Sequence, residues 1–198
     1  MELQEYEKAL MKDVSGLWCG VDEAGRGPLA GPVCAAAVIL PETFDLSGLN
    51  DSKKLTDKKR EILFPQIIAC AVSYGIAFAT PEEIDEHNIL GATYLAMNRA
   101  VEQLDPAPVK LLIDGNRNEG IKGDSICVIG GDAKCASIAA ASVLAKVTRD
   151  RYMVKLAEMY PQYDFEKHKG YPTKLHYERI REYGVCPEHR MSFLKKMH

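Results

Sequence analysis

The stretch Gly20-Val21-Asp22-Glu23-Ala24-Gly25-Arg26-Gly27-Pro28 places two adjacent carboxylates after an apolar segment, and a glycine-flanked arginine follows directly. Carboxylates are costly inside a buried strand unless they are paired or bind a metal. We therefore expect these acids where a strand ends and the chain turns. An isolated Asp-Glu pair before glycine and proline is also typical of a solvated turn. The rest of the chain must decide between a turn and a site.

The amino-acid composition limits the classes of protein to which this chain can belong. The chain has 198 residues, of which 46% are hydrophobic and 27% are charged, as in a globular protein with one core. A net charge of -3 excludes a uniformly basic coat for nucleic acid but permits local basic clusters. The N-terminal segment lacks the apolar core of a signal peptide, and no apolar run approaches a membrane span, so we expect a cytoplasmic protein.

Hydrophobic spacing predicts the order of helices and strands. Strands are expected over 16–23, 32–40, 70–79, 109–113 and 125–129. Helices are expected over 2–12, 57–69, 88–104, 137–159, 173–183 and 187–197, with a short acidic turn opened by Pro81. This order indicates an α/β fold, in which a mixed sheet of about five strands is flanked by helices and followed by a C-terminal helical region.

The segment from Pro161 to Pro172 is the best candidate for a boundary. It would separate a catalytic domain over 1–160 from a C-terminal helical, substrate-binding region over 161–198. The alternative is that both form one continuous domain.

Acidic residues end three of the predicted strands. Asp22 and Glu23 follow the first strand, Asp114 follows the fourth, and Asp132 comes shortly after the fifth. In open α/β sheets, ligands bind outside the carboxyl ends of the strands, so neighbouring strands would bring these acids together. Mg²⁺ or Mn²⁺ would relieve their repulsion, because both ions prefer oxygen ligands. Such a cluster can seat two ions that hydrolyse a phosphodiester.

One geometric difficulty concerns Asp22 and Glu23. Consecutive side chains in a regular strand face opposite sides. They can share a site if the strand breaks there, which Gly25 and Gly27 would allow, or if one of them binds through its backbone carbonyl. The sequence leaves both alternatives open.

The Gly25-Arg26-Gly27 segment also has two interpretations. It is either a simple loop that needs positive φ angles, or backbone that lies against a sugar-phosphate. In the second case its N–H groups would bind a 2′-hydroxyl, the group that distinguishes RNA from DNA.

Seven motifs in order, covering nearly the whole chain, resemble the bacterial type 2 ribonuclease H (ribonuclease HII) family. They lie at 20–33, 49–55, 113–115, 131–132, 137–150, 168–173 and 189–193. The resemblance implies a ribonuclease H-like sheet and a metal-dependent endonuclease. Such an enzyme hydrolyses the RNA strand of RNA–DNA hybrids and nicks 5′ to ribonucleotides embedded in duplex DNA, a step in their removal. The products carry 3′-hydroxyl and 5′-phosphate ends.

The resemblance also implies roles for single residues. Asp22, Glu23, Asp114 and Asp132 would be catalytic and would bind two Mn²⁺ or Mg²⁺ ions when substrate is present. The substrate-binding residues would be Gly25, Arg26, Gly27, Lys53 and Tyr171. Of these, the Gly-Arg-Gly segment would read the 2′-hydroxyl, the tyrosine would stack on the next sugar, and the lysine would contact phosphate.

Three further polar residues share one face of the helix predicted over 137–159, namely Ser142, Lys146 and Arg149. They would support the site or the contact with the substrate backbone, or else they form a solvated row beside helix-packing alanines. A monomer without membrane contact is expected.

Two other classes of function share single features with this chain. A sugar kinase or related ATPase also uses acids at sheet edges, but the chain has no Gly-x-x-x-x-Gly-Lys-Ser/Thr loop. A non-catalytic module that binds hybrids would be favoured by loss of one of the four acids, and all four are present.

Overall fold

The computed structural model describes residues 3–49 and 55–195, and its centre is a five-stranded sheet in the order β3-β2-β1-β4-β5. The strands β1 (Trp18–Ala24), β2 (Val33–Ile39) and β3 (Ser73–Ala79) are antiparallel neighbours. The strands β4 (Lys110–Asp114) and β5 (Ser125–Val128) run parallel to β1. The prediction of a mixed α/β sheet is confirmed.

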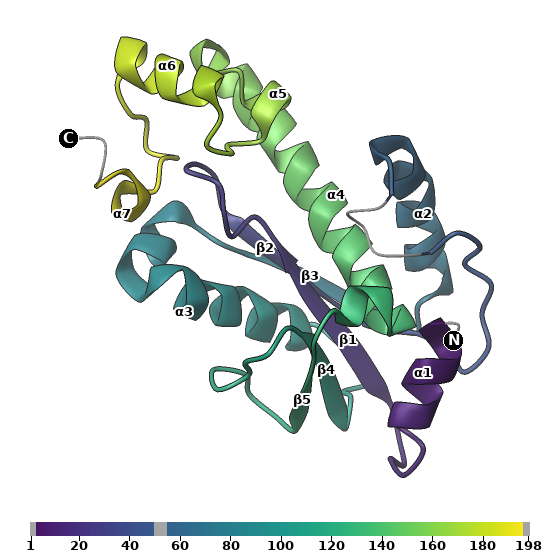
Figure 1. Ribbon diagram of the computed structural model, residues 1–198. Helices are drawn as coiled ribbons and strands as arrows, with labels where there is room; N and C mark the ends of the chain where they lie inside the picture. The colour runs from purple at the N-terminus through teal and green to yellow at the C-terminus, as the bar shows by residue number, and fades with distance from the viewer. Residues whose placement is uncertain (1–2, 50–54, 196–198) are drawn as a thin grey trace.

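Helices cover both faces of the sheet (Figure 1). Helix α3 (Pro81–Val101) packs on one face, and α4 (Ala136–Met159) and α2 (Asp57–Cys70) pack on the other. Side-chain alternation along the strands explains the two layers. In β1, Cys19 and Val21 point into the core shared with α3, whereas Gly20 faces the start of α4.

The start of α4 lies very close to β1. A Cβ on Gly20 would be only 2.2 Å from the backbone nitrogen of Ile138, so the contact requires glycine. Glu7, from helix α1 (Leu3–Leu10), accepts hydrogen bonds from the backbone nitrogen of Ser137 at 2.9 Å and from its hydroxyl at 2.6 Å. A carboxylate at a helix N-terminus is favourable, and here it anchors the helix that lies over the end of β1.

The C-terminal elements gather at one end of the sheet, beside the loop between β1 and β2 (Figure 1). They are α5 (Phe165–His168), α6 (Lys174–Tyr183) and α7 (Met191–Leu194), preceded by a 3-10 turn at Pro161–Tyr163. The backbone nitrogens of Leu29 and Gly31 donate to the carbonyls of Gly170 and Glu188, each at 2.8 Å. The division into two regions near residue 160 stays a prediction.

Helix α3 begins earlier than predicted. Its first residue is Pro81, so the expected acidic turn is the first part of the helix. Thr80 and Glu83 form a reciprocal capping box that starts it, and a kink at Asn88, with φ of 58°, separates this part from the rest. The kink explains why helical spacing is readable only after residue 88.

The last helix is shorter than the predicted 187–197. Only Met191–Leu194 is helical in the described part of this segment. The backbone before it pairs with the β1–β2 loop, with a bridge between Ala30 and His189 and a bond from the Arg190 nitrogen to the Leu29 carbonyl. These long-range hydrogen bonds are made by residues that the local spacing had assigned to a helix, so the helix is shorter than predicted.

In the described residues, no helix combines the length and apolarity that a membrane crossing requires. All six cysteines are free thiols, and Cys19, Cys34 and Cys135 are buried.

Candidate active site

Three of the predicted acids converge at the carboxyl ends of the central strands. The parallel register of β1 and β4 pairs Val21 with Ile113, which sets Asp22 beside Asp114. Asp132 lies in the 3-10 turn Gly131–Ala133 after β5. One carboxylate oxygen from each of the three aspartates lies within 4.8 Å of the others. Within residues 3–49 and 55–195, no other group of three acidic, histidine or cysteine ligands meets this distance.

The turn after β5 brings Asp132 back toward β4. Gly130 has φ of 64°, in the left-handed region that glycine tolerates best. A Cβ on Gly131 would lie 2.5 Å from the Cδ1 atom of Ile138. The backbone nitrogen of Gly131 also donates to Oδ1 of Asp114 at 2.7 Å, which joins the two acidic segments directly.

Asp22 is held in a buried, negatively charged environment. Burial raises the pKa of its carboxyl well above the ordinary value, and the charges of Glu23 and Asp114 raise it further. Hydrogen bonds from the Ser142 hydroxyl and the Glu23 backbone nitrogen act in the opposite direction. The bond from Ser142 supports the interpretation of this α4 face as part of the site. A bound cation would favour the ionised carboxyl.

Glu23 is placed differently from the three aspartates. Strand β1 continues to Ala24, and Asp22 and Glu23 pair in regular register with Ala36 and Ala35. Of the two alternatives that the sequence left open, a strand break at these acids is therefore not the one observed. Glu23 does not belong to the three-aspartate group, and its Oε1 lies 3.5 Å from the Arg26 Nη1. Its charge nevertheless acts on Asp22.

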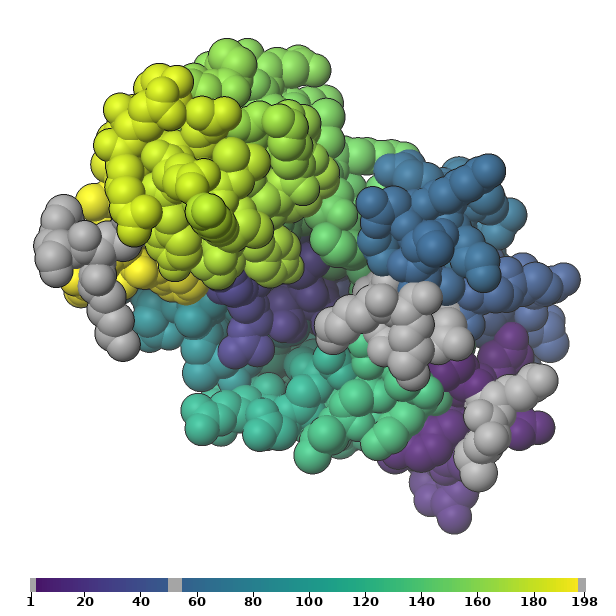
Figure 2. Space-filling model, turned by 45° about the horizontal axis from the view of Figure 1, so that its top comes forward, coloured from purple at the N-terminus to yellow at the C-terminus, as the bar shows by residue number. Residues whose placement is uncertain are grey.

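The Gly-Arg-Gly segment lies next to the predicted stacking tyrosine. Gly25 is buried with φ of 97°, whereas Arg26 and Gly27 are exposed. A Cβ on Gly27 would lie 3.7 Å from Cε1 of Tyr171, which is itself exposed. Figure 2 shows atoms of the early chain, in dark purple, at the surface between the yellow C-terminal region and the green segment that leads into α4.

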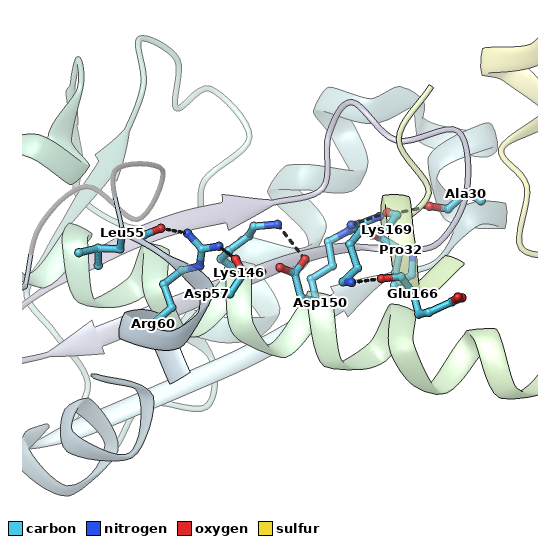
Figure 3. Close-up of polar contacts among 10 residues, drawn as sticks. Ala30, Pro32, Leu55, Asp57, Arg60, Lys146, Asp150, Glu166 and Lys169 are labelled. Carbon is cyan, nitrogen blue, oxygen red and sulfur yellow. Dashed lines mark hydrogen bonds and ion pairs between the residues drawn. The ribbon is translucent and has the colours of Figure 1, made fainter. Parts of the chain in front are cut away.

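Arg149 is buried and does not belong to a solvated row. Its Nε donates to the carbonyl of Pro32 at 2.9 Å, and its two terminal nitrogens donate to Ala30 at 3.2 Å and Lys169 at 3.0 Å. Figure 3 shows these three acceptor residues together at one side of α4. Arg149 thus joins the β1–β2 loop to the segment that carries Tyr171.

The predictions that Lys146 and Lys53 contact the substrate or its backbone have different outcomes. Lys146 forms an ion pair with Asp150 at 2.8 Å, one turn along α4 (Figure 3). Lys53 lies outside the described residues, so its contact with phosphate stays a prediction.

Three buried histidines support the Tyr171 segment, a role that the sequence analysis did not find. The Nδ1 of His176 donates to the Tyr171 carbonyl at 3.0 Å, and its Nε2 lies 3.2 Å from Nε2 of His189. His168 stacks on His176, with ring centroids 4.3 Å apart, and its Nδ1 accepts from Gly170. The three residues have no local spacing signal, because only the folded C-terminal region brings them together.

We expect acid to destabilise this histidine cluster. Burial lowers the pKa of His176 and of His189 to about 4, below the ordinary 6.5. The unfolded chain therefore binds protons that the folded chain excludes, so stability is complete above about pH 6.5 and is lost as the pH falls toward about 4. From about pH 7 to about pH 5, the loss should be on the order of 1–2 kcal/mol per imidazole.

Thermal unfolding of the parent and of His176→Gln at both pH values checks this expectation. The variant should lose less stability on acidification than the parent. The matched control is His87→Gln, because His87 has a half-exposed side chain on α3. Equal pH dependence in the parent and in His176→Gln would contradict the expectation.

A family model described as ribonuclease HII matches residues 19–197. The ribonuclease HII of Shewanella pealeana is 56% identical over 178 residues, which cover 90% of this chain and 88% of that protein. The ribonuclease HII of Neisseria meningitidis is 58% identical over 178 residues and covers 89% of this chain and 92% of its own.

A solved structure is also similar to this chain. The crystal structure of the ribonuclease H2 from Pyrococcus horikoshii superposes with a TM-score of 0.73 at 30% identity. The superposition covers 89% of this chain and 93% of the archaeal chain.

Proposed function

This chain belongs to the ribonuclease HII family of metal-dependent endoribonucleases, and from that premise we propose how its own residues carry out the reaction. It hydrolyses the RNA strand of RNA–DNA hybrids and nicks duplex DNA on the 5′ side of an embedded ribonucleotide. The products keep a 3′-hydroxyl and a 5′-phosphate. The observation that carries the proposal is the convergence of Asp22, Asp114 and Asp132 within 4.8 Å at the strand ends.

These three carboxylates fit a divalent metal site. They provide an all-oxygen donor set, which suits Mg²⁺ or Mn²⁺. Burial and like charge also raise the pKa of Asp22, so a cation would relieve a real electrostatic cost. We assign the metal to Asp22, Asp114 and Asp132, and we assign Glu23 to the second of two ions that bind with substrate. When bound, such ions activate a water molecule and stabilise the leaving oxygen of a phosphodiester.

The residues around the acids orient them. Ser142 donates to Asp22, and the Gly131 nitrogen donates to Asp114, so both carboxylates have a defined direction. Preorganised groups lower the reorganisation that the reaction requires.

Substrate recognition is assigned to the neighbouring exposed segment. The N–H groups of Arg26 and Gly27 would bind the ribose 2′-hydroxyl, and the ring of Tyr171 would pack against the next sugar. Tyr171 lies beside Gly27, where an added Cβ would be 3.7 Å from Cε1 of its ring, and this closeness supports the assignment, because both must reach adjacent nucleotides. The resemblance to the family assigns Lys53 to phosphate. We expect the enzyme to act in the cytoplasm as a monomer.

Cleavage of a DNA duplex that carries one ribonucleotide tests the proposal. With Mg²⁺ or Mn²⁺, the parent should nick once, at the phosphate 5′ to the ribonucleotide, and should turn over repeatedly. The same duplex without the ribonucleotide should stay intact. Cutting of both duplexes, or binding without turnover, would contradict the assignment and favour a different nuclease or a non-catalytic binding module.

A further inference from the structure

The side chain of Arg190 donates four hydrogen bonds to the loop between β1 and β2. Its side chain is fully buried, and its Nε donates to the Gly31 carbonyl at 2.9 Å. Its terminal nitrogens donate to the carbonyls of Arg26 at 3.0 Å, Pro28 at 2.8 Å and Gly25 at 2.7 Å. All four side-chain hydrogen bonds therefore end on the backbone between β1 and β2.

Two other donors complete the same pattern. The backbone nitrogen of Arg190 donates to the Leu29 carbonyl at 2.8 Å. Arg149 takes the carbonyls of Ala30 and Pro32. Between Gly25 and Pro32, the carbonyls bound by these two arginines are those of residues 25, 26, 28, 29, 30, 31 and 32.

The direction of the carbonyls sets the direction of the N–H groups. In a planar trans peptide, the carbonyl of one residue and the N–H of the next point in opposite directions. Because the carbonyls of Gly25 and Arg26 point inward to Arg190, the N–H groups of Arg26 and Gly27 point outward. Within the described residues neither N–H donates to another group, whereas those of Leu29 and Gly31 bind the C-terminal segment.

Burial of this arginine is costly, which argues for a specific role. Burial and the nearby charge of Arg149 lower the pKa of Arg190 to about 9. A buried cation is tolerated only when its donors are satisfied, and here backbone carbonyls satisfy them. The planar fork of a guanidinium reaches several carbonyls at once, which a lysine ammonium at the end of a flexible stem does not reproduce.

We propose that Arg190 is a positioning residue for ribose recognition: it holds the loop carbonyls inward, so that the N–H groups of Arg26 and Gly27 face the substrate. This inference rests on the proposed function, in which that loop reads the 2′-hydroxyl. Arg190 does not touch the substrate itself. Its effect passes through the backbone of residues 25–31, and Arg149 fixes the other side of the same loop.

Binding selectivity tests the proposal without relying on cleavage. The Kd values for a duplex with one ribonucleotide and for the matched all-DNA duplex are measured in an Asp114→Asn background. The selectivity is the ratio of the two. Arg190→Lys should lower it at least about tenfold, the equivalent of one lost hydrogen bond, while affinity for the all-DNA duplex changes little. Arg99→Lys is the matched control, because Arg99 also binds a backbone carbonyl, that of Phe78 at 3.0 Å, but on edge strand β3.

The outcomes separate two failures. A parent that binds both duplexes equally would overturn hydroxyl reading by the loop, and this inference with it. A selective parent with unchanged selectivity in Arg190→Lys, or with equal losses on both duplexes, would overturn only the role of Arg190. If Arg190→Lys does not fold, Phe193→Leu takes its place, because the Phe193 ring lies 5.3 Å from the guanidinium and steadies it. Unchanged selectivity in that variant would also overturn the proposal.

Discussion

Asp22→Asn should abolish cleavage and, at the same time, raise the thermal stability of the metal-free protein. The carboxyl is buried, and its pKa is raised well above the ordinary value by burial and by the charges of Glu23 and Asp114. At neutral pH the folded chain therefore bears a cost that the unfolded chain does not. Asparagine removes the charge and keeps one oxygen, which can accept the hydrogen bond from the Glu23 backbone nitrogen. The melting temperature should therefore rise by at least about 2–4 °C, the shift that about 1 kcal/mol produces in a domain of this size.

The sign of this effect has a direct check. An acid whose folded pKa is raised destabilises the fold at every pH above its unfolded pKa, so the gain should shrink as the pH falls toward about 4. Melting curves in a chelator at about pH 7 and about pH 5 measure it. Added Mn²⁺ should stabilise the parent more than the variant. Asp13→Asn, at an exposed aspartate, is the matched control. A melting temperature lower than the parent's in the chelator would contradict the expectation.

Gly25→Ala and Gly27→Ala should have opposite consequences, although only one residue separates them. Alanine at position 25 would adopt a φ near 97° and place its Cβ 2.0 Å from Nε of Arg149. Backbone strain alone costs about 1–3 kcal/mol, and displacement of a buried guanidinium adds to it, so the fold should lose at least about 2 kcal/mol. At position 27 the Cβ would meet only Cε1 of Tyr171 at an ordinary 3.7 Å, so stability should stay within about 0.5 kcal/mol.

The two variants should also differ in how they affect cleavage kinetics. Gly27→Ala keeps the fold but puts a methyl group where the ribose is proposed to approach, so KM for the one-ribonucleotide duplex should rise about tenfold or more. For Gly25→Ala, activity should fall with the folded fraction. Chemical denaturation and steady-state kinetics on both variants supply the measurements. A stable Gly25→Ala, or a Gly27→Ala with the parent's KM, would show that the roles are wrongly divided.

The fold was predictable largely because strand and helix signals are local. Alternating and continuous apolar runs identified all five strands. Helix α2 begins at a local signal of the same kind, because the Thr56 hydroxyl before it accepts a hydrogen bond from the backbone nitrogen of Lys59. One error arose where distant groups compete with local spacing, and another at a local kink. Arg190 pairs with the β1–β2 loop, so the last helix is short, and the kink at Asn88 hides the first part of α3.

The acids were predictable for a chemical reason. A carboxylate that ends an apolar strand is expensive unless it has a partner, so Asp22, Asp114 and Asp132 stood out in the sequence. Their convergence depends on the order of strands in the sheet. Strand β4 lies beside β1, although the 85 residues 25–109 lie between these two strands in the sequence. The position of Glu23 relative to Asp22 also could not be predicted, because it depends on whether β1 stays regular at these two residues.

The sequence by itself determined the chemistry available to this protein: acids at strand ends, a glycine-flanked arginine and a tyrosine in the C-terminal segment. The tertiary structure alone decided how the loop that carries Gly25 and Gly27 is oriented. Its carbonyls are bound by Arg149 and Arg190, which lie more than a hundred residues away in the chain. Backbone direction depends on hydrogen-bond partners, and partners so distant leave no periodic trace in the residues around the loop.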